Sequence, residues 1–241
     1  QIACTRAQLG EDCAVAAVMS GHWVQGGRPA IADKWTRTKL ALLGGADLVL
    51  ELPTVWAVSS AETFARGAME LLAAAQVVDV LSFGSECGDA DMLQRVAACL
   101  NNPEYETGLR RLVDGGAPFA AARQRAVEGL LGPELAELLS TPNNNLGVEY
   151  IRALDRLNRD IRPMTVRREG APHDSLLLGT ERPRFCSATQ LRAYLGREDW
   201  TALELYLPKN GPEVLRAGWS GFPGLERAER GLLARLRTMT A

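Results

Sequence analysis

The sequence has little of what marks a secreted, metal-binding or membrane protein. Its five cysteines are scattered without a C-x-x-C pair, and an odd number of dispersed cysteines favours a reducing compartment over a disulfide framework. Only two histidines occur, His22 and His173, so a histidine-rich metal site is excluded and we expect no metal held by protein side chains. No apolar run approaches the roughly 18 residues of a membrane span, and no signal peptide is apparent. We therefore expect a cytoplasmic protein with no membrane partner.

The chain also has no large excess of positive or negative charge. The formal net charge is −2, so the chain as a whole gives no electrostatic sign of nucleic-acid binding. Any RNA contact has to come from a local basic face. With 241 residues, 46% of them hydrophobic and 23% charged, the chain is long enough for one large α/β domain or a domain with a helical appendage.

Short apolar runs alternate with amphipathic segments, which predicts an α/β fold with a doubly wound parallel sheet. Strands are expected at 14–19, 48–52, 77–83 and 161–167, and helices at 1–10, 34–43, 61–75, 146–157 and 187–195. Residues 89–139 have helical character throughout and form an insertion. We expect an α/β domain over 1–195, followed at 196–241 by the start of a helical C-terminal region.

Glycines and arginines follow the expected strands, where ligands bind in an open parallel sheet. Gly21 and Gly84 each come directly after a strand, and Arg167 and Arg168 lie at the carboxyl end of the strand at 161–167. A glycine there lets backbone N–H groups approach a nucleotide. It also serves a plain tight turn, and the spacing alone does not separate the two interpretations.

Two polar motifs have both a structural and a functional interpretation. Asn143 and Asn144 belong to a polar turn, 141–145, which is typical of a helix start, although an amide can also recognise an adenine or ribose edge. Ser187 and Gln190 match a capping box, while the same helix start, with Thr189 and Arg192, could bind a phosphate.

A row of arginines could form the local basic face. Arg152, Arg156 and Arg159 lie on one side of a predicted helix, and Arg162 follows. Such a face is usually solvated and paired with neighbouring acids, here Glu149, Asp155 and Asp160. The alternative is that these arginines hold RNA phosphates.

Several strings, taken in order, resemble one family. They are MSGHWVQGGRPAIADKWTRTKLALLGGADLVLELP, SAETFARGAMELL, LSFGSECGD, TPNNNLGVEYIRAL, the R-x-x-x-x-H-D stretch that ends at His173-Asp174, and SATQLR. Together they resemble tRNA(Met) cytidine acetate ligases of the H-x-G-H nucleotidyltransferase superfamily, from about residue 14 to 192. The resemblance implies a Rossmann-like sheet with a helical insertion and a helical C-terminal region, and it implies that residues 1–195 form a nucleotidyltransferase-like ATP-binding domain. It also implies a Mg²⁺-assisted reaction of ATP with acetate to acetyl-adenylate, and acetyl transfer to N4 of the wobble cytidine of elongator tRNA(Met).

The resemblance also assigns roles to individual residues. The implied ATP contacts are Gly84, Asn144 ahead of Asn143, and one of the pair Arg167 and Arg168. Ser187, Thr189 and Arg192 resemble the second phosphate-binding motif of the superfamily. The implied tRNA contacts would come from the arginine row, Arg152, Arg156, Arg159 and Arg162.

The sequence departs from the family in two places. Nothing precedes Gln1, where the family has a strand and an N-P-F-H-x-G-H loop, so no catalytic residue is assigned and we expect a fragment that does not turn over. Ser20-Gly21-His22 matches only half of that motif because Met19 occupies its first position, and Gly26 stands where the family has Arg. Two other functions therefore stay open: adenylyl transfer to a small metabolite, and an inactive nucleotide- or RNA-binding remnant.

Overall fold

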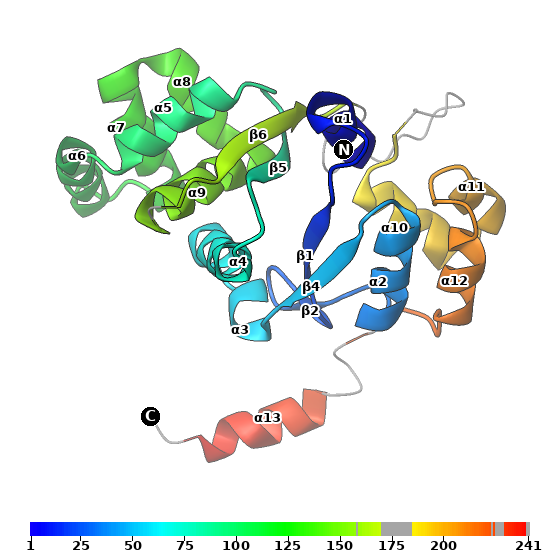
Figure 1. The fold of residues 1–241 in the computed structure, drawn as a ribbon. Coiled ribbons are helices and arrows are strands. Elements are labelled where there is room, and N and C mark those ends of the chain that lie inside the picture. The colour runs from blue at the N-terminus through cyan, green and yellow to red at the C-terminus, as the bar shows by residue number, and fades with distance from the viewer. Residues whose placement is uncertain (158, 170–184, 223, 225–228, 240–241) are drawn as a thin grey trace. The chain divides into compact units, whose positions relative to one another are not determined.

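The computed structural model describes residues 1–157, 159–169, 185–222, 224 and 229–239, which belong to two compact units (Figure 1). Unit 1 comprises residues 1–13 and 59–169, and unit 2 comprises residues 14–58 and 170–241. His173 and Asp174, predicted to follow the paired arginines, lie outside the described residues.

Unit 1 is built on a parallel strand pair. β5 (Val80–Ser85) pairs with β6 (Arg162–Arg167), and the register runs from Val80 opposite Arg162 to Ser85 opposite Arg167. Parallel strands need a long crossover, and all the regular elements described within it here are helices. Its elements are α5 (Ala90–Leu100), α6 (Pro103–Asp114), α7 (Phe119–Leu131), α8 (Pro133–Glu137), a 3₁₀ turn (Leu138–Ser140) and α9 (Pro142–Leu157). Figure 1 shows α5, α6, α7 and α8, which form the helical insertion, grouped beside α9.

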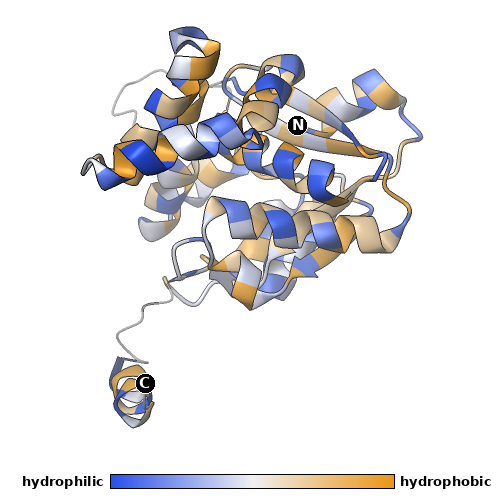
Figure 2. Ribbon diagram, turned by 90° about the vertical axis from the view of Figure 1, so that its left-hand side faces the viewer, coloured by the Kyte–Doolittle hydropathy of each residue, from blue (hydrophilic) through white to orange (hydrophobic). Residues whose placement is uncertain are grey.

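Two further helices complete unit 1. α4 (Ala61–Ala75) packs along α9. α1 (Ile2–Leu9) is tied to β5 by a hydrogen bond between the hydroxyls of Thr5 and Ser82, 2.7 Å apart. Figure 2 shows the result of amphipathic patterning, with hydrophilic and hydrophobic residues on different sides of the helices. On α9 the buried side includes Val148, Ile151 and Leu154.

Unit 2 contains a second parallel pair, β1 (Ala16–Ser20) with β4 (Leu48–Leu52), joined through α2 (Lys34–Leu43). The Asp33 carboxylate caps α2 by accepting N–H bonds from Trp35 and Thr36. The remaining elements are a small hairpin of β2 (Trp23–Val24) and β3 (Arg28–Pro29), then α3 (Thr54–Ala57), α10 (Ala188–Gly196), α11 (Trp200–Glu204), α12 (Gly211–Ala217) and α13 (Glu229–Thr238). Ala32, Leu195, Leu203 and Leu215 form one buried hydrophobic cluster of this unit.

The α/β class with parallel strand pairing is confirmed, and the helices predicted at 34–43 and 61–75 match α2 and α4. The polar turn expected at 141–145 is wrong, because α9 already begins at Pro142. Proline at the first position of a helix loses no hydrogen bond, so the three asparagines form the first turn. The loop expected at 20–32 contains the β2–β3 hairpin. No helix among the described residues is long and apolar enough to cross a membrane.

Gly147 sits where α9 crosses β5, and an added methyl group has no room there. A Cβ at Gly147 would lie 2.5 Å from Cε2 of Phe83 and 3.3 Å from Cδ1 of Leu93. We expect Gly147→Ala to lower the free energy of unfolding by about 1–3 kcal/mol, the usual cost of overpacking. Gly129→Ala on α7 is the matched control, since nothing lies within 4 Å of its Cβ. The control should be neutral or stabilising by up to about 1 kcal/mol, because alanine favours helix. Equal effects of the two changes in chemical denaturation would contradict this packing.

Candidate functional site

The carboxyl ends of β5 and β6 bring together residues that are far apart in sequence. Gly84 lies opposite Val166, and Ser85 opposite Arg167. The backbone N–H of Arg168 then donates to the carbonyl of Ser85 at 2.8 Å. A Cβ built on Gly84 would be 3.4 Å from Cγ of Arg168. Gly84 and the two predicted arginines therefore share one edge of unit 1.

The loop after β5 lies close against the end of β6. Gly88 has φ +68°, and a Cβ there would lie 2.6 Å from Cβ of Arg167. The position therefore needs glycine for both its backbone conformation and its close approach. Ser85 is fully buried, and its Oγ accepts the N–H of Gly88 at 2.9 Å and lies 2.6 Å from the hydroxyl of Thr165. These contacts fix the loop around Arg167.

Glu86 joins the same loop to the start of α9. Its Oε1 accepts hydrogen bonds from the backbone N–H and the Nδ2 of Asn143, at 3.2 and 2.6 Å, and its Oε2 accepts the N–H of Asn144 at 2.7 Å. In return, Oδ1 of Asn144 accepts the N–H groups of Glu86 and Cys87 at 2.9 and 3.0 Å. A carboxylate at a helix N-terminus also interacts favourably with the helix dipole. The polar turn and the strand end thus form one connected site.

The pKa of Glu86 reflects this position. Burial acts to raise the pKa, but the hydrogen bonds from Asn143 and Asn144 outweigh it, and the pKa lies below the ordinary glutamate value. The contribution of Glu86 to folding is therefore fully present above the unfolded pKa of glutamate and is lost as pH falls through the lower folded value.

The contacts define how Asn144 can meet a ligand. Its side chain is buried, with 3% of the residue exposed, and both lone pairs of Oδ1 are used within the loop. Only its Nδ2 can donate to a bound molecule. In Asn143 it is the Nδ2 that is engaged within the protein, because it donates to Glu86.

Ser187, Thr189 and Arg192 lie in unit 2. The Ser187 hydroxyl caps α10 by accepting the N–H of Gln190 at 3.0 Å, as the sequence predicts. The return half of the capping box is not formed, because Oε1 of Gln190 is buried and has no hydrogen-bond partner in the described part of the chain. Thr189 is half-buried and Arg192 is exposed.

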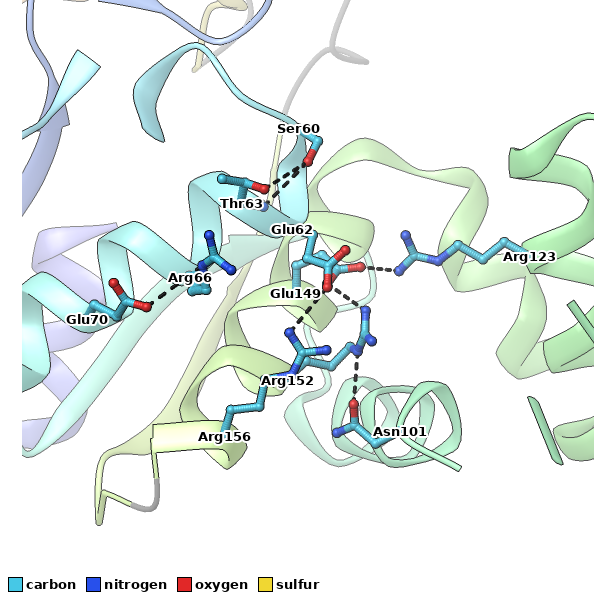
Figure 3. Close-up of polar contacts among 10 residues, drawn as sticks. All are labelled: Ser60, Glu62, Thr63, Arg66, Glu70, Asn101, Arg123, Glu149, Arg152 and Arg156. Carbon is cyan, nitrogen blue, oxygen red and sulfur yellow. Dashed lines mark hydrogen bonds and ion pairs between the residues drawn. The ribbon is translucent and has the colours of Figure 1, made fainter. Parts of the chain in front are cut away.

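The predicted arginine row separates into committed and exposed members. Figure 3 shows Arg152 and Arg123 both directed at the carboxylate of Glu149. Arg152 Nη1 lies 2.9 Å from Glu149 Oε2, and its Nε donates to Oδ1 of Asn101 at 3.2 Å. The pairing of this row with Glu149 is therefore confirmed for Arg152, whose side chain is only 13% exposed.

The other arginines of the row are exposed. Arg156 forms a surface ion pair with Glu62 at 3.2 Å. Arg159 borders a hollow of about 480 Å³ that Asp155 and Asp160 also line. Arg162 is exposed at the start of β6.

Charged residues that the sequence interpretation missed surround the loop after β1 in unit 2. Arg37 Nη1 donates to the carbonyls of Ser20 and Gly21 at 2.9 and 2.7 Å, and burial lowers its pKa. Gly21 leaves room for Glu51, whose Oε1 would be 2.1 Å from an added Cβ and whose Oε2 pairs with Lys34 at 2.6 Å. The glycine itself was the only sequence signal of this packing.

Comparisons with known proteins place these features in a family. The HIGH Nucleotidyl Transferase family matches residues 1–241. The tRNA(Met) cytidine acetate ligase of Caldanaerobacter subterraneus is 44% identical over 197 residues, which are 80% of this chain and 48% of that protein. The enzyme of the same name from Halothermothrix orenii is 34% identical over 241 residues, 94% of this chain and 56% of its own length. The chain thus spans about half the length of the curated relatives it matches.

Solved structures support the same family. The apo form of Thermotoga maritima TmcAL aligns with a TM-score of 0.81 at 36% identity, covering 90% of this chain and 52% of that one. A second form of that protein, bound with alpha-thio ATP, aligns with a TM-score of 0.79 at the same identity, covering 90% and 51%. The resemblance inferred from the sequence motifs is confirmed.

Proposed function

The chain belongs to the HIGH nucleotidyl transferase family, and from that premise we propose that it is the ATP-binding portion of a tRNA(Met) cytidine acetate ligase. The reaction joins acetate to the α-phosphate of ATP, releases pyrophosphate, and passes the acetyl group to N4 of the wobble cytidine. A tRNA substrate implies action in the cytoplasm.

The carrying observation is the cluster of Gly84, Asn144 and Arg168 at one edge of unit 1. Gly84 offers backbone close to a ligand, Asn144 offers a directed Nδ2, and Arg168 offers a positive charge. Attack on the α-phosphate builds negative charge on phosphate oxygens, so preorganised donors and cations of this kind stabilise the transition state. In unit 2, the start of α10 with Ser187, Thr189 and Arg192 is proposed as a second phosphate-binding motif.

Mg²⁺ would enter with the nucleotide. No group of three or more His, Cys, Asp or Glu side chains in the described ranges could hold a metal ion. Mg²⁺ usually keeps several waters and is bound through substrate phosphates. In this proposal the ATP phosphates would carry the ion, and the ion would neutralise the charge of the departing pyrophosphate.

We propose that tRNA is held by the exposed arginines of the row, while Arg152 is committed to Glu149. Arg159 and Arg162 are the exposed members of the row that form no ion pair with any residue in the described part of the chain. Replacing both with alanine should weaken tRNA binding and reduce the slope of log affinity against log salt by about 1.4–1.8, since each phosphate contact contributes about 0.7–0.9. Arg110→Ala on α6 serves as control, because Arg110 is an exposed arginine paired with Glu106. An unchanged slope in filter binding at several salt concentrations would assign the RNA contact elsewhere.

Separate titrations of ATP and elongator tRNA(Met) distinguish the alternatives. A cytidine acetate ligase is expected to bind both ligands saturably. Binding of tRNA without ATP would favour a nucleic-acid-binding remnant. Binding of ATP without tRNA would favour an adenylyltransferase for a small metabolite, with the exposed arginines idle.

A further inference from the structure

Glu86 and Asn144 make a reciprocal connection between the loop after β5 and the first turn of α9. The Glu86 carboxylate receives three hydrogen bonds from Asn143 and Asn144, and the Asn144 amide oxygen receives two from the loop backbone. We refer to these contacts between Glu86, Cys87, Asn143 and Asn144 as the latch. Its loop end lies two residues after Gly84, and its helix end carries the asparagine proposed to face ATP.

We infer that Glu86 is a positioning residue of the ATP site, acting through the latch to fix Gly84 and the Asn144 amide relative to one another; the inference rests on the proposed function. Glu86 carries negative charge, so direct contact with the triphosphate would be unfavourable. Both of its carboxylate oxygens already accept hydrogen bonds from Asn143 and Asn144, which suits Glu86 to holding the site rather than the nucleotide.

The geometry explains why another acceptor of the same size does not replace it. Both oxygens of Glu86 are used: Oε1 by Asn143 and Oε2 by Asn144. Glutamine has one acceptor oxygen and an NH₂ group that only donates. Glu86→Gln therefore turns one side of the latch from an attraction into a donor–donor contact, and it removes the charge that complements the α9 N-terminus.

The structural effect of Glu86→Gln should be confined to the surroundings of the buried Asn144. When the carboxylate contact is lost, the first turn of α9 can separate from the loop, and Nδ2 of Asn144 loses its fixed direction. The strand pairing of β5 with β6 and the Ser85–Thr165 hydrogen bond do not involve Glu86. The unit should therefore stay folded while the ligand-facing groups lose their alignment.

The test compares wild-type protein, Glu86→Gln and the control Glu106→Gln by ATP titration, thermal unfolding and site-resolved amide hydrogen exchange. Glu106 pairs with Arg110 on the exposed side of α6, so the control removes the same charge away from the site. For Glu86→Gln we expect the ATP dissociation constant to rise about tenfold and the exchange of the Cys87 and Asn144 amides to accelerate by a similar factor, as for loss of one hydrogen bond to a charged group. Unfolding should remain cooperative, and Glu106→Gln should match wild type in all three measurements.

Each contrary outcome has a distinct meaning. Unchanged exchange at Cys87 and Asn144 overturns the latch. Faster exchange with unchanged ATP affinity overturns the positioning role and leaves a structural contact only. If wild-type protein binds no ATP, the proposed function fails and the positioning role with it. Loss of ATP affinity together with early unfolding of the whole chain would also overturn it, since the effect would then be global.

Discussion

Replacing Glu149 with alanine is expected to lower the free energy of unfolding of the chain by about 3–5 kcal/mol, the range for breaking a buried ion pair from one side. Glu149 is 2% exposed and lies between Arg123 and Arg152, whose side chains are 15% and 13% exposed (Figure 3). Its removal leaves two guanidinium groups with little solvent and no carboxylate. Glu149 on α9 pairs with Arg123 of α7 as well as with Arg152 of its own helix, so its loss should loosen the packing of α7 on α9.

Urea denaturation at neutral pH measures this effect, and Glu106→Ala is the matched control. Glu106 also pairs with an arginine, Arg110, but that pair is exposed and should contribute at most about 1 kcal/mol. A drop of less than 1 kcal/mol for Glu149→Ala would mean that Arg123 and Arg152 find other partners and that the pair does not anchor the insertion.

Arg168→Ala is expected to weaken ATP binding by about 10- to 150-fold, the equivalent of a charge-assisted hydrogen bond of about 1.5–3 kcal/mol. Arg168 is the arginine whose side chain borders Gly84, with its Cγ 3.4 Å from the position of an added Cβ. The stem of Arg167 instead lies against Gly88. Because successive residues at a strand end point to opposite sides, the two arginines should not be equivalent.

Arg167→Ala is therefore the informative comparison, measured by calorimetric ATP titration alongside Arg168→Ala. We expect a smaller change for Arg167, whose removal mainly loosens the Gly88 loop. If Arg167→Ala weakens ATP binding more than Arg168→Ala does, the nucleotide lies on the Gly88 side of the strand end. If neither change affects binding, the edge of β5 and β6 is not the ATP site.

Local patterns in the sequence predicted much of unit 1 because the physical signals there are local. α4 begins after the Ser60 cap, and α9 carries apolar residues at helical spacing. The association of Gly84 with the arginines after β6 followed from the rule that strand ends in a parallel sheet share an edge. The start of α9 was misplaced because asparagine usually marks turns. The carboxylate that stabilises this helix start comes from Glu86, 57 residues earlier than Asn143.

Long-range polar partners account for what could not be predicted. Nothing in the local sequence distinguishes the buried partner Glu149 from the surface acids Asp155 and Asp160, because all three lie within a few residues of Arg152. The bonds from Arg37 to the carbonyls of Ser20 and Gly21 depend on how α2 packs on β1. Such contacts depend on the tertiary structure, which local patterns in the sequence do not predict.

Backbone amide NMR during a titration with alpha-thio ATP tests the central claim most directly. If ATP binds at the shared edge of β5 and β6, the largest chemical-shift changes will come from the backbone amides of Gly84, Asn144 and Arg168. The changes along α9 will be smaller. Saturable binding whose shifts leave these three amides untouched would contradict the assignment of this edge as the nucleotide site.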